Sequence, residues 1–429
     1  MESIAFIVFQ WVAILFLSLM LVLALFEPAL PYKVTAIPTE PLDSPGFRRL
    51  LASLAGSHGH DGCKVEVLTN GEQYYEAELA AIRQAKHSVN LEAYIFQKGE
   101  VTRRFLEALT ERARAGVRVN LVLDAIGALL TWDSYFADLR AAGGRVCFYH
   151  PLKWWTLPRI NNRTHRELII VDGTVGFVGG AGFADHWLLP HGRHKKKARW
   201  RDTMFRVEGK IVRDLQSVFA ENWLESSGDL LTDSGYFPPL EDHGDVEAMV
   251  VCSTPTTGRS ARNRMVYQTL LASARETIEI TTPYFLPDRS ACTEMVRAIR
   301  ERGVAVTILT PGQHSDHLLT RRSSRRLYGP LLKAGAKIFE YEPTMLHAKV
   351  LVIDAKWTVV GSTNFDHRSF GINDEVNLAS FDDTLAARLQ EDFRSDLRDS
   401  RRITYRKWYR RPLTERAHEL LGWLLERQQ

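Results

Sequence analysis

The chain has 429 residues, of which 45% are hydrophobic and 25% are charged, and its formal net charge is +4. This composition is globular and excludes an intrinsically disordered chain. The length allows a membrane segment and about two domains of ordinary size. Because the net charge is small, any attraction to anions must come from local basic patches, and a nucleic-acid-binding function is not expected.

The first expected element is a helix over the almost wholly apolar residues Ile4 to Phe26. At about 1.5 Å per residue, this stretch is long enough to cross a hydrocarbon core of roughly 30 Å. A cleaved signal peptide fits less well, because the apolar segment is preceded by Glu2 and not by basic residues, and no small-residue cleavage site precedes Pro28. A buried core helix is the remaining alternative. We therefore expect a transmembrane anchor in residues 1–30, a Pro-, Gly- and Ser-rich linker in residues 31–60, and the rest of the chain on the cytoplasmic side.

Strand-like and helical patterns alternate after the linker. The strands are short and rich in β-branched residues, and the helices between them have ten to fifteen residues. In chain order we expect a strand at 65–68, a helix at 74–86, a strand at 89–96, a helix at 101–115, a strand at 117–123, a helix at 131–142 and a strand at 146–149. This alternation predicts an α/β fold in which a mostly parallel sheet is flanked by helices.

The second half of the chain repeats this order. Residues 303–309 match residues 116–122, and residues 334–341 match residues 142–149. The sequence therefore predicts two duplicated α/β domains, one at residues 61–240 and one at residues 241–400. A basic and aromatic tail follows at residues 401–429, with leucines at helical spacing near its end.

Two matched motifs begin at His165 and His347. In both copies an aspartate, Asp172 or Asp354, follows the histidine by seven residues, and a glycine follows it by fourteen. A lone histidine beside a strand is usually structural. Two histidines in matched motifs favour one active site built from both halves of the chain.

The second motif has the residue types that a phosphoryl group requires. Lys349 follows His347 by two residues, so both side chains point to one face of a strand. The lysine can neutralise phosphate oxygens while the histidine attacks phosphorus or protonates a leaving oxygen. Ser362 and Asn364 follow a tight glycine turn and can donate hydrogen bonds to the same oxygens, as can the backbone of Gly180, the counterpart of Ser362 in the first motif.

A nucleophilic histidine also needs an acceptor on its other ring nitrogen. Asp202 follows the first motif and Glu375 follows the second, each next to a strand-like run. We expect these carboxylates to orient the histidines. Asp172 and Asp354 lie an odd number of residues from the histidines, so they face the other side of the strand and are expected to support a turn.

The two motifs differ at two positions. Glu167 stands where the second motif has Lys349, and Gly182 stands where it has Asn364. An anion facing a phosphate is unfavourable. Three explanations remain open: Glu167 pairs with Lys349 or with an arginine such as Arg163, it receives a cationic headgroup or acceptor, or the first half is catalytically weakened.

The spacing from His347 through Lys349 to Asp354, with Ser362 and Asn364, resembles the HKD motif of the phospholipase D superfamily. The ordered set of motifs along the chain is similar to that of bacterial cardiolipin synthases. The segments that carry this resemblance are Asn70–Tyr74, Glu92–Phe96, Leu123–Gly127, Trp200–Thr203, Thr282–Phe285, and Trp408 with Arg410–Pro412 in the tail.

The resemblance implies a phosphatidyltransferase of the bacterial inner membrane that uses no metal and no cofactor. It implies that His165 attacks phosphatidylglycerol to form a phosphohistidine, while His347 serves as acid and base, and that a lipid alcohol then yields cardiolipin. Phospholipid substrates and an anionic membrane surface are the implied partners. A phospholipase D-type hydrolase or nuclease, or a catalytically weakened lipid-binding protein, is the alternative.

Overall fold

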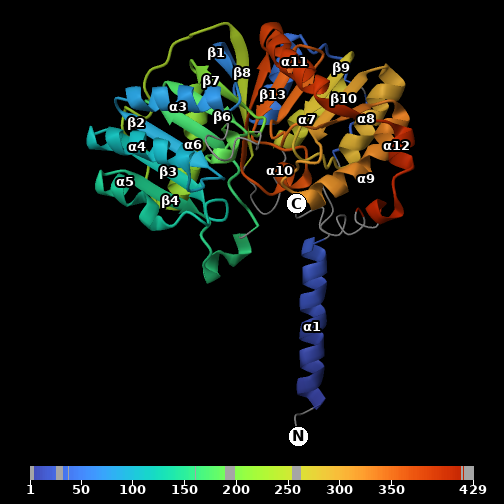
Figure 1. Ribbon diagram of the computed structural model, residues 1–429, viewed down its shortest axis with the longest axis horizontal. Helices are drawn as coiled ribbons and strands as arrows, with labels where there is room; N and C mark the ends of the chain where they lie inside the picture. The colour runs from blue at the N-terminus through green and yellow to red at the C-terminus, as the bar shows by residue number, and fades with distance from the viewer. Residues whose placement is uncertain are drawn as a thin grey trace.

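The computed structural model describes residues 4–25, 32–36, 38–159, 161–188, 199–253, 262–416 and 419. Two α/β halves lie side by side, and the N-terminal helix projects away from them (Figure 1). The elements up to the junction of the halves are α1 Ile4–Leu25, α2 Pro45–Ala55, β1 His60–Thr69, α3 Gly71–Gln84, β2 Ser88–Ala93, α4 Glu100–Arg114, β3 Arg118–Asp124, η1 Asp133–Phe136, α5 Ala137–Ala141, β4 Arg145–Tyr149, η2 Trp154–Arg159, β5 Glu167–Val171, β6 Val175–Gly179, η3 Asp185–Trp187, β7 Thr203–Glu208 and α6 Val212–Ser227.

The second half repeats this order and adds a strand and a short helix at its end. Its elements are β8 Val246–Ser253, α7 Arg262–Ser273, β9 Thr277–Thr281, α8 Arg289–Arg302, β10 Ala305–Pro311, α9 Leu318–Ala334, β11 Lys337–Tyr341, β12 Val350–Ile353, β13 Trp357–Gly361, α10 His367–Gly371, β14 Glu375–Phe381, α11 Asp383–Arg398, β15 Ser400–Ile403 and α12 Tyr405–Tyr409.

All fifteen strands form one sheet in the order β15-β11-β10-β9-β12-β13-β14-β8-β1-β7-β6-β5-β2-β3-β4. The order on one side of the β8–β1 junction mirrors the order on the other, so that β5 corresponds to β12 and β2 to β9. The structure thus contains the expected duplication. The domain limits at residues 61–240 and 241–400 stay a prediction, because the sheet runs without a break across the junction.

The expectation of a mostly parallel sheet was wrong. Among the strands that the structure describes, the parallel pairs are β2–β3, β3–β4, β9–β10 and β10–β11, while the other ten neighbouring pairs are antiparallel. Parallel neighbours require a long crossover connection. Only residues 172–174 separate β5 from β6, and only residues 354–356 separate β12 from β13, so the motif strands fold back as hairpins.

Helices cover both faces of the sheet. On one face, α6 and α11 pack against strands of both halves around a single apolar cluster that includes Phe219, Trp223 and Leu389. On the other face each half has its own cluster, beneath α3 and α4 in the first half and beneath α2, α7 and α8 in the second. The shared cluster holds the halves in a fixed relation, which a site built from both of them requires.

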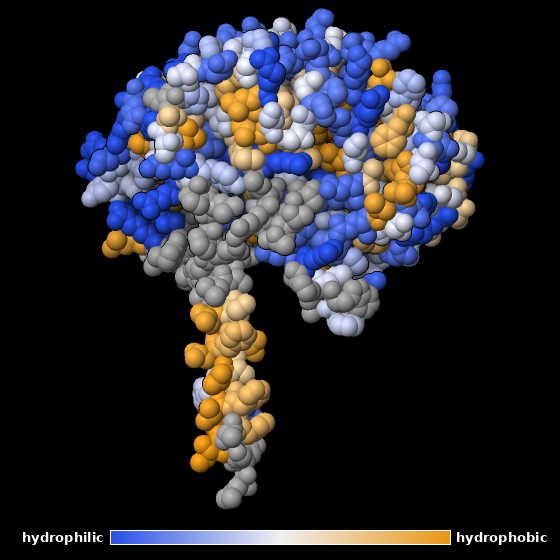
Figure 2. Space-filling model, turned by 180° about the vertical axis from the view of Figure 1, so that it is seen from behind, coloured by the Kyte–Doolittle hydropathy of each residue, from blue (hydrophilic) through white to orange (hydrophobic). Residues whose placement is uncertain are grey.

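The N-terminal helix differs from the expectation, and the expected helix at the end of the C-terminal tail is not tested. The large apolar side chains that the structure describes on α1 are exposed to solvent (Figure 2). The expectation of a transmembrane helix in residues 1–30 is corrected, because none of the helices among the described residues is both long and apolar enough to cross a membrane. Most of the amphipathic helix expected near the end of the 401–429 tail falls on residues outside the described ranges.

Candidate active site

The two motif histidines lie in extended segments just before β5 and β12, at the junction of the halves. His165 N donates to Asp374 O at 2.9 Å, and His347 N donates to Arg201 O at 2.7 Å. Each histidine is therefore bonded through its backbone to the opposite half, and the two arrangements are related by the duplication.

The carboxylate that contacts His165 comes from the other half. Glu375, the first residue of β14, places both carboxylate oxygens 3.1 Å from His165 Nδ1. The ring of Tyr94 contacts the imidazole edge-on, with 5.4 Å between ring centroids. Among the described residues no partner contacts His165 Nε2. The side chain keeps 12% of its surface exposed, so this nitrogen is open to a substrate.

His347 has the reciprocal arrangement. Its Nδ1 lies 2.8 Å from Oδ2 of Asp202, which comes from the first half and also accepts from Trp187 Nε1 at 3.0 Å. The rings of Trp187 and Trp200 both contact the imidazole, each with centroids 5.4 Å away. Asp202 and Glu375 therefore each contact the histidine of the opposite half, whereas their positions along the chain suggested that each orients its own.

Lys349 lies directly against His347. Its Nζ donates to His347 O at 2.7 Å and lies 2.8 Å from Nδ1 and 3.1 Å from Nε2 of the ring. Burial lowers the pKa of His347, and the ammonium of Lys349 lowers it further, against the opposing charge of Asp202. Burial acts to raise the pKa of Asp202, but His347 and Lys349 outweigh it, so the net shift is downward. This arrangement favours neutral His347 beside ionised Asp202.

The glycine turns shape the space beside these groups. A side chain at Gly180 would collide with Lys349, since a Cβ there would lie 2.8 Å from Cδ and 3.0 Å from Nζ. In the second half the counterpart, Ser362, is buried and its hydroxyl donates to Glu375 Oε2 at 2.5 Å. Asn364 is only 4% exposed, and its Oδ1 is buried without a partner. Asn364 Oδ1 can therefore accept one more hydrogen bond.

Glu167 has neither of the ion-pair partners considered from the sequence. Arg163 instead contacts Asp124, at 3.5 Å, and Lys349 lies on the His347 ring. Glu167 Oε1 accepts from the backbone N–H groups of Tyr94 and Ile95 at 3.2 and 3.4 Å. Its Oε2 is buried without a partner.

Burial raises the pKa of Glu167 well above its usual value, and the two backbone N–H groups and Lys349 only partly oppose this. A neutral carboxylic acid at this position removes the electrostatic conflict with a phosphate. Gly182 fits the same arrangement, because a Cβ there would lie 3.0 Å from Glu167 Oε1 and 2.8 Å from Ile95 Cβ. The glutamate therefore occupies space that a side chain at Gly182 would need, and the two differences from the second motif belong together.

Asp172 and Asp354 do not contact the histidines. Both have a positive φ, 52° and 51°, in the hairpin turns that follow β5 and β12. Asp172 accepts from the backbone N–H groups of residues 86–88, and Asp354 accepts from those of residues 275–277. These carboxylates tie each motif turn to the start of the neighbouring strand, β2 or β9.

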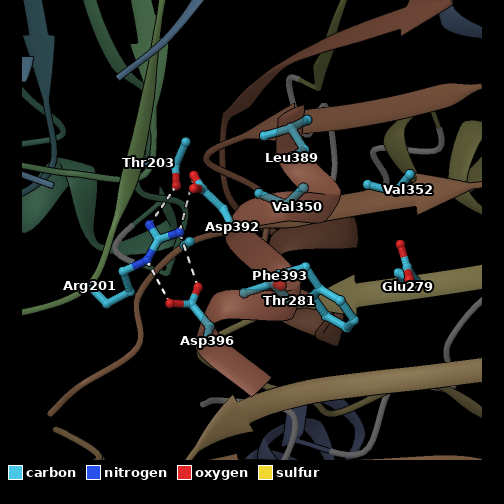
Figure 3. Close-up of a pocket in the computed structure, with 11 residues that line it drawn as sticks. Arg201, Thr203, Glu279, Thr281, Val350, Val352, Leu389, Asp392, Phe393 and Asp396 are labelled. Atoms are coloured by element: carbon cyan, nitrogen blue, oxygen red, sulfur yellow. Dashed lines mark hydrogen bonds and ion pairs between the residues drawn. The ribbon is translucent and has the colours of Figure 1, made fainter. Parts of the chain in front are cut away.

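A buried arginine that was not singled out from the sequence supports Asp202. Arg201 Nη1 donates to Asp202 O at 2.7 Å and to Thr203 Oγ1 at 2.8 Å. Its Nε and Nη2 contact Asp396 of α11 at 3.1 and 3.0 Å, and Nη2 lies 3.4 Å from Asp392 (Figure 3). Helix α11 of the second half therefore holds the segment before β7 that carries Asp202. The segment Trp200–Thr203 was noted as a motif, but nothing in it indicates contacts to residues almost two hundred positions away.

Tyr94, Trp187 and Trp200 were also not predicted as site residues. Their aromatic side chains are usual for a core, and only the fold brings them onto the histidines. Within the described ranges, no group of three or more His, Cys, Asp or Glu side chains is arranged to hold a metal ion.

Comparisons with known proteins agree with this geometry. A family model described as "Cardiolipin synthase, PLD-like domain" matches residues 79–223 and 267–397. Cardiolipin synthase 1 of Bacillus anthracis is 33% identical over 380 residues, covering 86% of this chain and 73% of that protein. The cardiolipin synthase of Geobacillus kaustophilus (strain HTA426) is 34% identical over 408 residues, covering 94% of this chain and 80% of that protein.

Among solved structures, phosphatidylserine synthase of Haemophilus influenzae Rd KW20 superposes with a TM-score of 0.68 and 14% identity, covering 89% of this chain and 99% of that one. This likeness shows the shared fold. The duplicated α/β fold, with histidine–carboxylate pairs formed across its halves, is that of a phospholipase D-like enzyme. Within this class the chain belongs to the cardiolipin synthase family, which confirms the resemblance found in the sequence.

Proposed function

We propose that this protein is a phosphatidyltransferase of cardiolipin synthase type, which transfers a phosphatidyl group from phosphatidylglycerol to a lipid alcohol. The observation that carries the proposal is how the two ring nitrogens of His165 are bonded. Its Nδ1 is held by Glu375, and its Nε2 has no partner among the described residues. An imidazole fixed in this way presents a nucleophilic nitrogen, and the carboxylate stabilises the positive charge that develops on attack.

In the first step His165 Nε2 attacks phosphorus, and the bond between phosphorus and the glycerol oxygen breaks. His347 in its protonated form gives its proton to that oxygen, so that glycerol leaves and a phosphatidyl-histidine remains. The Asp202 carboxylate stabilises protonated His347 for this transfer.

In the second step the hydroxyl of the acceptor lipid gives its proton to neutral His347 while its oxygen attacks phosphorus. The bond between phosphorus and His165 Nε2 breaks, and cardiolipin is released when the acceptor is a second phosphatidylglycerol. The lowered pKa of His347 supports this role, because it keeps the base available at neutral pH. Water in place of the lipid alcohol would give phosphatidic acid.

Four groups are proposed to bind the phosphate oxygens. Lys349 supplies the positive charge, and Asn364 supplies the N–H donors of its side-chain amide. The backbone N–H of Gly180 and the neutral carboxyl of Glu167, through its unpartnered Oε2, donate from the first half. In this scheme Glu167 donates a hydrogen bond to the phosphate where the second motif has the cation Lys349. The first half would then take part in catalysis and would not be weakened.

We also propose that the enzyme works at a bacterial cell membrane, with its catalytic halves on the cytoplasmic side. Its substrates would be membrane lipids, and the apolar side chains described on α1 are exposed, as expected for contact with lipid. The polar surface of the body contrasts with this helix (Figure 2).

The test is to incubate the purified full chain with phosphatidylglycerol labelled in the headgroup glycerol and, separately, in the acyl chain. Labelled cardiolipin and released glycerol in equal amounts would support the proposal. Phosphatidic acid without cardiolipin would instead show a hydrolase, and no turnover would favour a lipid-binding protein. Protein quenched in neutral denaturant should carry acyl label on His165, and a His165→Ala variant should carry none. Label on His347 in the unaltered chain would reverse the assigned roles.

A further inference from the structure

A basic cavity lies at the outer end of the second half, away from the catalytic histidines. Its volume is about 590 Å³, and it lies between α9 and the segment that contains α12. The cations lining it are Arg325, Arg406, Lys407, Arg410 and Arg411, and the acidic residue among its lining side chains is Glu415. A volume of this size accommodates a glycerol phosphate headgroup.

The fold fixes the cavity wall through Trp408. The indole Nε1 donates to Arg325 O in α9 at 2.6 Å. Its ring lies so close to Gly329 that a Cβ there would meet the ring at 2.3 Å. Arg411 stacks over the same ring, with its guanidinium carbon 4.1 Å from the centroid. The wall carrying the cations is thus packed onto α9 and is not a free tail.

Carboxylates neutralise two of the five cations. Arg325 pairs with Glu415, and Arg411 forms two hydrogen bonds to Glu419 at 2.6 and 2.7 Å. Arg406, Lys407 and Arg410 have no carboxylate partner within the part of the chain that the structure describes. These three side chains line one cavity and their positive charges are not paired with carboxylates. Such a site favours an anionic ligand.

Exposed aromatic and apolar side chains are next to the lining residues along the chain. Tyr405 and Tyr409 are 40% and 60% exposed, and Leu413 is 78% exposed. Tyrosines beside cations suit the boundary between lipid headgroups and acyl chains. A free anion would gain nothing from these side chains, whereas a phospholipid would use them together with the cations.

We propose that this cavity is a second lipid site, which binds the phosphodiester headgroup of an anionic phospholipid and holds the second half against the membrane. The site is distinct from the catalytic centre. It follows β15 at the edge of the sheet, and β11, β10 and β9 separate β15 from β12, the strand that His347 precedes. Helix α12 accordingly lies at the outer side of the second half (Figure 1). The inference depends on one part of the proposed function, namely that the enzyme works on membrane lipids.

The test uses the full chain in mixed micelles of a neutral detergent and a photoreactive phosphatidylglycerol, with cross-links mapped by mass spectrometry. We expect cross-links in residues 404–416, and we expect unlabelled phosphatidylglycerol to compete for them while phosphatidylcholine does not. The variant Arg406→Gln/Lys407→Gln/Arg410→Gln should lower the affinity on the order of 100-fold, since each cation near an anionic lipid contributes about fivefold.

The matched control is Arg83→Gln/Lys86→Gln/Arg114→Gln, which removes two arginines and one lysine at exposed positions of the first half. The extent of cross-linking in residues 404–416 of this control variant should equal that of the unaltered chain. Equal labelling of both triple variants would overturn the proposal, as would competition by inorganic phosphate or a DNA oligonucleotide as effective as that by phosphatidylglycerol. A His165→Ala variant separates the two hypotheses: it should lose transfer and keep labelling at residues 404–416. Loss of labelling in that variant would show that the cross-links report the catalytic site.

Discussion

Glu375 in the second half lies 3.1 Å from Nδ1 of His165 in the first half, through both of its carboxylate oxygens. Asp202 in the first half contacts His347 in the second half in the same way, at 2.8 Å. Each half therefore contains one histidine and the carboxylate for the other histidine. A half on its own would hold no complete histidine–carboxylate pair.

Replacing Glu375 with glutamine should lower kcat for lipid transfer by about 10³-fold or more, because the neutral amide cannot stabilise the imidazolium and can select the wrong tautomer. The measurement is the rate of cardiolipin formation from labelled phosphatidylglycerol. The matched control is Glu279→Gln, which changes a partly buried carboxylate of the same half that is bonded to Gln390. Loss of activity of similar size in both variants would argue against a specific role for Glu375.

Replacing Glu167 with glutamine should leave transfer within about tenfold of the unaltered rate, because the amide keeps a neutral hydrogen-bonding group in place of the neutral acid. Replacing it with lysine should abolish transfer, since a second ammonium would be buried near Lys349. Rates on phosphatidylglycerol measure both effects. A large gain in the lysine variant would instead show that the first half is weakened in the natural chain.

The same carboxyl should make folding stability depend on pH. Burial raises the pKa of Glu167 above its unfolded value of 4.5, so the folded state favours the protonated form. The resulting stabilisation is complete below pH 4.5 and is lost as the pH rises through the folded pKa. The melting temperature of Glu167→Gln should therefore increase relative to that of the unaltered chain as the pH is raised from about 4.5. A difference that is constant across this range would mean that Glu167 is ionised in the folded protein.

Replacing Lys349 with methionine should move the acidic limb of the pH profile of kcat/KM for the acceptor lipid to higher pH, in addition to lowering the rate. His347 must be neutral for that step, and its pKa lies below 6.5 because of burial and the charge of Lys349. Removing the ammonium therefore raises this pKa. Lys356→Met, which removes an exposed lysine paired with Asp43, should leave the limb unmoved. A limb that stays in place in Lys349→Met would refute the assignment of this limb to His347.

Replacing Arg201 with lysine should lower kcat by about 10- to 100-fold with little change in KM, because one ammonium cannot hold Asp392, Asp396 and the Asp202 backbone together (Figure 3). Steady-state kinetics on phosphatidylglycerol check this. Arg206→Lys in β7, the strand that follows Arg201, is the control, because Arg206 pairs with Glu208 near the surface. A raised KM with unchanged kcat would point to substrate binding in place of positioning.

The chemistry of the site could be predicted from the sequence because it depends on local spacing. A histidine and a lysine two residues apart on a strand share a face in any fold, so His347 and Lys349 were expected together. The duplication also follows from residue order. The direction of β6 and β13 could have been read from the three-residue turns before them, but the surrounding strand–helix alternation favoured parallel pairing.

The partner of each histidine was decided by the tertiary structure. Residues 165 and 375 meet because the two halves form one sheet with a shared apolar cluster, and no local pattern encodes that contact. The raised pKa of Glu167 likewise comes from the fold, since its largest cause is burial and not a neighbour along the chain. The sequence thus determined the candidate groups of the site, through short-range geometry, while the packing of distant segments determined how these groups pair and in which direction their pKa values shift.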